Sequence, residues 1–276
     1  MSLFALALAL LAALMHAVWN LLVKSSDDQL VAAWTVVAGA AILALPVLAF
    51  SGIPDRSVWD LILISTVVQV AYVLTLAAAY RVGDLSFVYP LARGTSPVLV
   101  SLAGVAFLGD EISALGWIGV LTVTAALTWL AWRRADRSGL ALALVTGVLI
   151  SLYTAVDAAA VREQGSALSV IAAEFVLLSI ALGTVVLVMR GPSLMLGMVR
   201  DDWRKAAVGG FATGTAYLLV MIAALSAPVG LVSGVRETSV LIAVIASKLL
   251  LHEEVTRSQI GTVTAAVAGI ALIAIG

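Results

Sequence analysis

The chain has 276 residues, of which 63% are hydrophobic and 11% are charged, and its mean hydropathy is +1.15. Soluble domains contain about 45–50% apolar and about 25% charged residues, so this chain has too little polar surface to face water on all sides and is predicted to be an integral membrane protein. Its net charge of −1 and the lack of a basic patch give no sign of nucleic acid as a partner, and the absence of cysteine excludes disulfides, thiolate metal sites and cysteine nucleophiles.

Ten apolar segments follow one another along the chain, each near the roughly 20 residues that a helix needs to cross a bilayer. They are expected at 2–22, 30–50, 59–80, 86–107, 113–132, 139–161, 167–189, 206–227, 229–251 and 257–275. The runs are about twice as long as a barrel strand and do not alternate, which predicts an all-α membrane protein. The first run lacks a basic start and a cleavage site, and is therefore expected to be a span rather than a signal peptide.

The spans divide into five before RRADRS and five after it, with a first repeat at 1–135 and a second at 136–276. An odd number of crossings in the first repeat makes the second enter the membrane from the opposite side. The sequence therefore predicts two inverted five-helix repeats. In transporters built this way, binding sites lie near the bilayer midplane where the repeats meet.

Two matching stretches carry the strongest sign of function. The stretch SFVYPLARGTSPV at 86–98 and its counterpart VGLVSGVRETSVL at 229–241 each place one arginine inside a span, Arg93 and Arg236. An arginine in hydrocarbon costs about 3 kcal/mol or more, and a guanidinium offers five donors that suit a carboxylate or phosphate. We therefore expect both arginines to bind an anionic group of a substrate at the centre of a shared cavity.

The alternative is that the arginines form internal ion pairs, because Glu237 follows Arg236 directly. Adjacent residues on a helix do not face each other, so Glu237 is expected to pair elsewhere. Within the first span, His16, Trp19 and Asn20 follow one helical stripe that leads to Lys24. His16 changes charge near neutral pH, which makes it a candidate for a coupling proton as well as a packing residue.

Other polar side chains within the spans are candidates for the same cavity. Tyr153 and Asp157 lie at the positions of the sixth span that match His16 and Asn20, and Asp157 suits a cationic amine or a proton. Burial favours the neutral form of a carboxyl group, so Glu174 is a proton-carrier candidate, or else the partner of an arginine. The substrate-binding candidates are Arg93, Arg236, Tyr89, His16, Trp19, Asn20, Gln69, Tyr72, Tyr153, Asp157 and Tyr217, and the proton-coupling candidates are His16, Asp157, Glu174 and Glu237.

Two acidic turns, LGDEIS and LHEEVT, precede the fifth and tenth spans, and their acids Asp110, Glu111, Glu253 and Glu254 are expected to cap those helices. These turns, the motifs HAVWN and YPLARGTSP, and glycines that lead the closing helices occur together in this chain. In these features the chain resembles the EamA-type transporters of the drug/metabolite transporter superfamily. The resemblance implies that four helices of each half surround a central cavity, that the fifth supports them from outside, and that small metabolites cross by alternating access.

Charges in the loops predict how the chain is inserted. Eleven lysines and arginines fall on one side, and only Arg56 and Arg162 fall on the other. The count places both termini outside the cell membrane, whereas the family resemblance implies cytoplasmic termini.

These features favour a secondary active transporter of a small anionic or zwitterionic metabolite, such as an amino acid. Its expected partners are that substrate, the lipid bilayer and protons as a coupling ion. No cofactor or metal is expected, and ATP is not expected because no Walker motif is present. The alternatives are a flippase for a lipid-linked sugar or phospholipid, a passive channel, and a membrane enzyme, for which the sequence offers neither HExxH nor GxSxG.

Overall fold

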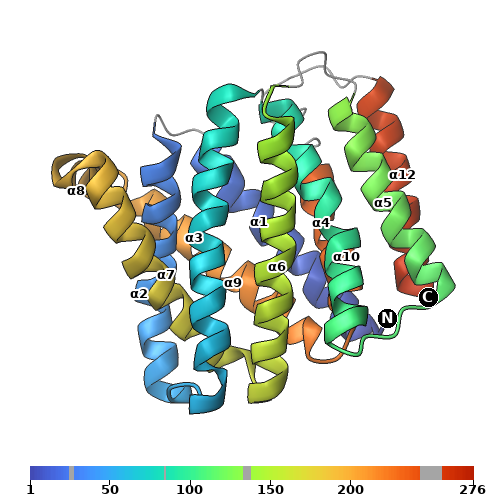
Figure 1. The fold of residues 1–276 in the computed structure, drawn as a ribbon, viewed down its shortest axis with the longest axis horizontal. Helices are drawn as coiled ribbons and strands as arrows, with labels where there is room; N and C mark the ends of the chain where they lie inside the picture. The colour runs from blue at the N-terminus through green and yellow to red at the C-terminus, as the bar shows by residue number, and fades with distance from the viewer. Residues whose placement is uncertain (25–27, 84, 133–137, 243–256) are drawn as a thin grey trace.

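The computed structural model describes residues 1–24, 28–83, 85–132, 138–242 and 257–276, which are helical apart from turns and short connections (Figure 1). The first half contains α1 (Leu3–Lys24), α2 (Gln29–Ser51), the 3-10 turn η1 (Arg56–Val58), α3 (Trp59–Val82), α4 (Leu85–Phe107) and α5 (Ala114–Trp132). The second half contains α6 (Leu140–Gln164), α7 (Ala167–Arg190), α8 (Pro192–Asp201), α9 (Trp203–Ala224), α10 (Val229–Arg236) and α12 (Arg257–Ile275). The expected all-α class is confirmed for these residues.

Six helical segments among the described residues are long and apolar enough to cross a membrane: Gln29–Ser51, Arg56–Val82, Ala114–Trp132, Leu140–Gln164, Ala167–Arg190 and Trp203–Ala224. The apolar segments Leu3–Trp19 and Gln259–Ile275 are shorter. Of the expected ninth span, residues 243–251 lie outside the described residues, as do Glu253 and Glu254 of the second acidic turn. The count of ten spans therefore stays a prediction.

The linker at 190–205 contains a helix that the sequence analysis did not anticipate. Gly191 ends α7 with a φ of +79°, a backbone conformation that favours glycine, and Pro192 then opens α8. Proline suits the first turn of a helix because the missing N–H would have no intrahelical partner there. Helix α8 lies at one end of the molecule, far from α5 and α12 at the other end (Figure 1).

The helices pack in pairs that relate the two halves of the chain. Helix α1 packs on α9 and α3 packs on α6, while α2 meets α7, α4 meets α10, and α5 meets α12. Matched in order along the chain, the helices of the two halves correspond as α1 with α6, α2 with α7, α3 with α9, α4 with α10 and α5 with α12. Under this match the contact of α1 with α9 corresponds to the contact of α6 with α3, and each of the other three contacts joins a helix to its own counterpart. This is the pattern expected of two halves related by a pseudo-two-fold axis.

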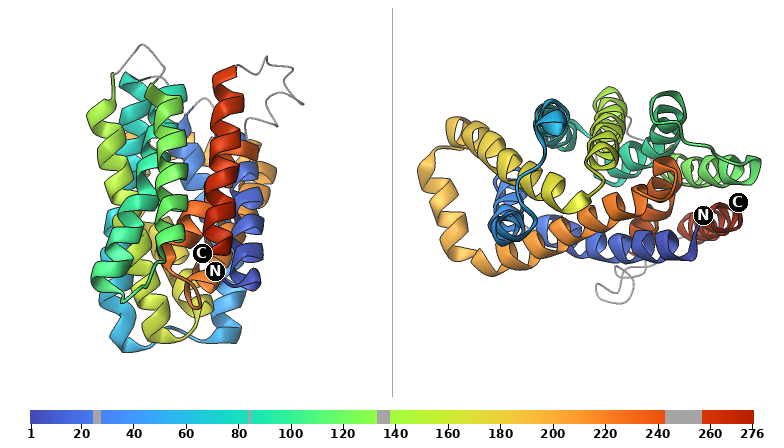
Figure 2. Two further views of the ribbon diagram at one scale, coloured as in Figure 1. Left: turned by 90° about the vertical axis from the view of Figure 1, so that its right-hand side faces the viewer. Right: turned by 90° about the horizontal axis from the view of Figure 1, so that it is seen from below.

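Glycines allow two of these crossings to be close. A Cβ atom on Gly39 of α2 would lie 2.2 Å from the carbonyl oxygen of Ala206 in α9, and one on Gly119 of α5 would lie 2.6 Å from that of Gly269 in α12. Larger side chains would force these helices apart, as in other membrane bundles that use small residues at crossings. Figure 2 shows α5 and α12 side by side at one end of the molecule, as the resemblance implied for the supporting helices.

The exterior of the bundle carries large apolar side chains. Ile42 is 67% exposed, Val67 is 69% exposed and Val188 is 81% exposed, on α2, α3 and α7. Large exposed apolar surfaces mark contact with other proteins or with membranes. On long, apolar helices such as these they indicate contact with lipid.

The first acidic turn differs from the expectation. Asp110 does contact a helix N-terminus, but that helix is α10 rather than α5: its Oδ2 accepts a hydrogen bond of 2.8 Å from the Val229 N–H. Its Oδ1 lies 2.8 Å from Nη2 of Arg162. Arg162 also donates from Nε to the carbonyl oxygen of Ala224, the last residue of α9, and from Nη2 to that of Ala227 just beyond it. Arg162 is therefore engaged with Asp110 and is not the partner of Glu174.

Candidate functional site

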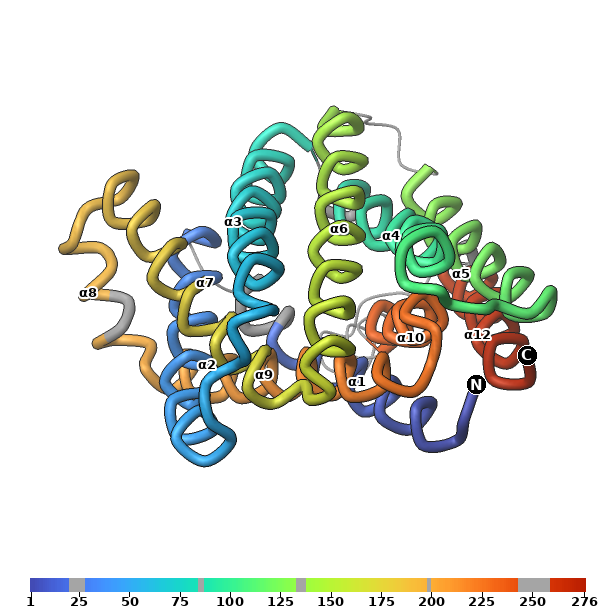
Figure 3. Tube along the Cα trace, turned by 60° about the horizontal axis from the view of Figure 1, so that its bottom comes forward, coloured from blue at the N-terminus to red at the C-terminus, as the bar shows by residue number. Residues whose placement is uncertain are grey.

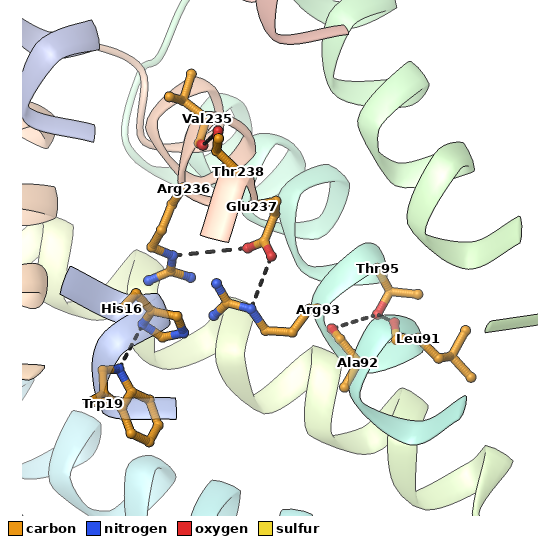
Figure 4. Close-up of polar contacts among 10 residues, drawn as sticks. All are labelled: His16, Trp19, Leu91, Ala92, Arg93, Thr95, Val235, Arg236, Glu237 and Thr238. Atoms are coloured by element: carbon orange, nitrogen blue, oxygen red, sulfur yellow. Dashed lines mark hydrogen bonds and ion pairs between the residues drawn. The ribbon is translucent and has the colours of Figure 1, made fainter. Parts of the chain in front are cut away.

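Helices α4 and α10 bring Arg93 and Arg236 together with Glu237 near the centre of the molecule. Helix α10 lies between α1 and α4 (Figure 3), and Glu237 follows directly after its last residue. Arg93 Nε donates a hydrogen bond of 3.0 Å to Glu237 Oε2, and Arg236 Nε lies 4.0 Å from Glu237 Oε1 (Figure 4). We call these three residues the arginine cluster.

The arginine cluster is buried and contains more positive than negative charge. Arg93 is 3% exposed, Arg236 is 2% exposed and Glu237 is 1% exposed. Two guanidinium groups and one carboxylate leave one positive charge in excess. Within the described part of the chain, Arg93 Nη2 and both Nε and Nη2 of Arg236 have no hydrogen-bond partner. A buried donor that makes no hydrogen bond costs free energy, so the cluster is suited to bind a further acceptor such as a carboxylate.

The alternative interpretation of the arginines, an internal ion pair, holds for Arg93, and substrate binding by the arginines stays a prediction. An internal ion pair exists, and the main partner of Glu237 is Arg93 from the other half rather than its neighbour Arg236, as helix geometry led us to expect. Sequence reasoning did not find this pairing: it left the partner of Glu237 unnamed and offered Glu174 as the acid that could pair with an arginine. The repeat was the available signal: it already set 229–241 opposite 86–98.

Helix α1 contributes His16 beside the arginine cluster (Figure 4). The imidazole lies close enough to interact electrostatically with Arg93 and Arg236. Trp19 Nε1 donates a hydrogen bond of 3.0 Å to His16 Nδ1, and the two rings meet edge to face at 5.1 Å. An imidazole nitrogen that accepts a hydrogen bond carries no proton, so His16 is neutral in this arrangement. The side chain of Asn20, the next candidate, lies outside the described residues.

Three tyrosines extend from the arginine cluster toward a second polar cluster. The ring centroids of Tyr72 and Tyr153 are 5.5 Å apart, and those of Tyr153 and Tyr217 are 6.1 Å apart. Tyr153 is close enough to interact electrostatically with both arginines and with Asp157. Tyr89 on α4 likewise interacts with Arg93 and Glu237. Helices α3, α4, α6 and α9 thus bring the predicted aromatic residues to one region.

The second cluster contains two buried acids, Asp157 on α6 and Glu174 on α7, which are 1% and 2% exposed. Tyr217 donates its hydroxyl to Asp157 Oδ2. Ser65 Oγ donates to Glu174 Oε1 at 2.9 Å, and the Gln69 amide donates to the same oxygen. The two carboxyl groups are close enough to interact with each other. We call these five residues the carboxyl cluster.

Two buried carboxyl groups that interact repel each other when both are ionised, which favours a proton on one of them. Among the described residues, no ion pair joins either acid to a cation, and no group of three metal-ligating side chains is found. The cluster is therefore chemically suited to hold a proton. Sequence reasoning named four of its members but missed Ser65, although Ser65 and Gln69 share a helix face at a spacing of four.

Comparisons with known proteins agree with this architecture. The model of the EamA-like transporter family matches residues 2–132 and 137–275, one match for each half. Among solved structures 28 chains match. One of them, titled only as the crystal structure of a protein, has a TM-score of 0.78 and 17% sequence identity over 98% of this chain and 96% of that one, which shows a shared fold. No curated protein matches. The chain, a multi-pass membrane protein by its apolar helices and by this match to both halves, belongs to the EamA-like transporter family of the drug/metabolite transporter superfamily.

Proposed function

We propose that this protein is a secondary active transporter that moves a small anionic or zwitterionic metabolite, such as an amino acid, across the cell membrane by alternating access. Membership of a transporter family supports transport rather than catalysis. The observation that carries the substrate class is the excess positive charge of the arginine cluster, in which three guanidinium nitrogens lack partners among the described residues. A substrate carboxylate would supply the missing acceptors, with Arg93 and Arg236 as donors.

The surrounding residues support a small substrate. Tyr72, Tyr89 and Tyr153 would form the walls around the bound metabolite, with His16 and Trp19 from α1. Aromatic and amide groups with a few placed charges are typical of sites for small molecules. Because the arginine cluster draws on α4 and α10, one from each half, a relative movement of the halves would open and close it, which is the usual basis of alternating access.

The carboxyl cluster supports protons as the coupling ion. A separate site for the proton lets the proton and the anion bind together, which favours movement of both in the same direction. A proton on Asp157 or Glu174 removes a negative charge from the neighbourhood of the substrate carboxylate. Proton binding and anion binding would then strengthen each other, and such coupling is reciprocal.

The loop charges support external termini, which would place Arg56 and Arg162 on the outer face. The chain has no cysteine, so the orientation can be tested with Ser166→Cys in intact cells and a membrane-impermeant maleimide. Labelling is expected if the turn before α7 is external. Protection of this cysteine until the cells are lysed would favour the cytoplasmic termini that the family resemblance implies.

Thermal stability of the purified protein tests the substrate class. A ligand that binds only the folded state at 100 times its Kd stabilises it by about 2.7 kcal/mol. Among the L-amino acids, short carboxylic acids and the matching amines, we expect the melting temperature to rise only with compounds that carry a carboxylate. The rise should vanish in Arg93→Met and persist in Arg200→Met, a control on the exposed surface of α8. An equal rise in Arg93→Met would refute the assignment.

Proton flux tests the coupling. Proteoliposomes that contain a pH-sensitive dye and receive a mixture of L-amino acids outside should acidify inside, with Glu174→Gln abolishing the acidification. Glu163→Gln, an exposed acid on α6, is the matched control and should behave as the wild type. Amino-acid uptake without any acidification in the wild type would leave the transport proposal intact and rule out this coupling ion.

A further inference from the structure

The arginine cluster contains one acid that the binding of a substrate anion does not require. The Glu237 side chain lies between two guanidinium groups and is fully shielded from solvent. It comes from the half of the chain that does not contain Arg93, so the pair joins the two repeats. Burying an additional carboxylate where an anion must bind would weaken that binding unless the carboxylate has a purpose of its own.

A purely structural role fits the contacts poorly. A carboxylate that neutralised both arginines would use both of its oxygens, as in a paired and fully hydrogen-bonded buried salt bridge. Within the parts of the chain that the structure describes, Oε2 accepts a hydrogen bond from Arg93, while Oε1 has no hydrogen-bond partner and lies 4.0 Å from Arg236 Nε. The free donors belong mainly to Arg236. Glu237 thus compensates one of two positive charges and leaves the other available.

The side chains around the cluster add little formal charge. His16 is neutral in the arrangement described, and Tyr72, Tyr89 and Tyr153 present phenol groups. Among the described residues, the formal charges within the cluster itself are therefore those of Arg93, Arg236 and Glu237. Their sum is one positive unit.

We propose that Glu237 is a charge-selectivity residue: it sets the arginine cluster at one positive charge, so that the site accepts a group with a single negative charge, a carboxylate, and rejects dianions such as dicarboxylates and phosphate monoesters. The proposal rests on the proposed function, in which the cluster binds the anionic group of the substrate. A dianion would leave a second negative charge buried without compensation, and the Coulomb energy of such a charge is large at low dielectric constant. With Glu237 neutral, the two arginines would match a dianion.

The test compares propionate and succinate, which differ in one carboxylate. Their dissociation constants are measured by calorimetry on the purified protein at neutral pH. The wild type should bind propionate at least tenfold more tightly than succinate. Glu237→Gln should reverse this preference, with the affinity for succinate rising at least tenfold. Glu163→Gln should keep the wild-type ratio, and Glu237→Asp, which retains the charge, should keep the preference for propionate.

The outcomes separate this proposal from the one it rests on. An unchanged ratio of the two dissociation constants in Glu237→Gln would overturn the selectivity role while the anion site stands. Absence of binding of any carboxylate to the wild type would overturn both. If Glu237→Gln does not fold, Arg236→Gln provides the second measurement: it leaves no excess charge, and it should lose at least tenfold in affinity for propionate, whereas retained affinity would contradict the proposal.

Discussion

The arginine cluster and the carboxyl cluster both lie inside the helical bundle, and both draw on the two halves of the chain, but they hold charge differently. In the arginine cluster the charges are permanent, because a guanidinium does not lose its proton in proteins, and Glu237 offsets only one of them. In the carboxyl cluster two neighbouring buried acids are suited to share a proton and have donors in Ser65, Gln69 and Tyr217. The arginine cluster is therefore suited to a fixed ionic partner and the carboxyl cluster to an exchangeable proton.

The largest loss of folding stability is expected when a fixed charge is removed. Arg93→Met leaves Glu237 buried without its hydrogen-bonded partner, and breaking a buried pair from one side costs about 3–5 kcal/mol. The double variant Arg93→Met/Glu237→Met should recover most of this loss, since no uncompensated charge remains. Denaturant unfolding of the two variants in detergent measures the difference. Equal stabilities for the single and double variants would show that the pair is not coupled.

Loss of a donor from the carboxyl cluster should have a smaller effect. Ser65→Ala removes the 2.9 Å hydrogen bond to Glu174 Oε1 and leaves this oxygen with Gln69 as its donor. A buried polar group that loses a partner costs about 1–3 kcal/mol. Thr66→Ala, on the next residue of α3, is the control, because its hydroxyl bonds to the carbonyl oxygen of Ile62 within the same helix. A larger loss in the control would argue against the special position of Ser65.

Removal of a titratable carboxyl group from the same cluster should alter stability even less, which separates the carboxyl cluster from the arginine cluster. Glu174→Gln keeps an acceptor oxygen and provides N–H donors where a protonated acid provides O–H, so we expect a change within about 1 kcal/mol. The unfolding free energy of this variant should stand well apart from that of Arg93→Met. A cost of 3 kcal/mol or more, as in buried ion pairs, would mean that the cluster holds an ionised acid.

The smallest change in stability is expected at the ion pair between Asp28 and Arg190, which lies at the ends of α2 and α7. Asp28 caps α2 and pairs with Arg190 at 2.7 Å. Burial alone would raise the pKa of Asp28, but the hydrogen bonds from the Val31 N–H and from Arg190, together with the charge of Arg190, outweigh it and lower this pKa below its ordinary value. The contribution to stability is therefore present above the ordinary pKa and is lost as the pH falls through the lowered one.

The measurement for this pair is the pH dependence of thermal unfolding. The melting temperature of the wild type should fall more steeply under acid conditions than that of Asp28→Asn, which still offers a capping oxygen. Surface pairs contribute only about 0–1 kcal/mol, so the two curves should differ by little at neutral pH. Parallel curves throughout would show that Asp28 does not titrate differently in the folded state.

Much of this fold could be predicted from the sequence, because the length of apolar runs and their internal repetition can be read directly along the chain. Uninterrupted apolar runs predicted the helices, and the matched arginines predicted that 86–98 and 229–241 belong together, as the contact between α4 and α10 shows. The partner of Glu237 could not be read in the same way. It depends on how α4 and α10 rotate about their axes, which packing against α1, α5 and α6 decides.

The acidic turn and the carboxyl cluster show the same limit of prediction from the sequence. Acids are favoured at helix N-termini, and Asp110 does lie at one. That helix is α10 rather than the expected α5, and Asp110 also pairs with Arg162. Asp157 and Glu174 were each predicted as candidates, yet nothing in their spacing along the chain shows that they lie close to each other. Their contact follows from the packing of α3 on α6 and α7.

Uptake of a radiolabelled L-amino acid mixture into proteoliposomes tests the central claim most directly, that Arg93 binds the carboxylate of a transported metabolite. The measurement compares wild type, Arg93→Ala and the surface control Arg200→Ala, each reconstituted at equal amounts after its folded state has been verified. We expect uptake in the wild type and in Arg200→Ala, and its loss in Arg93→Ala. Uptake by Arg93→Ala at the wild-type rate would contradict the claim.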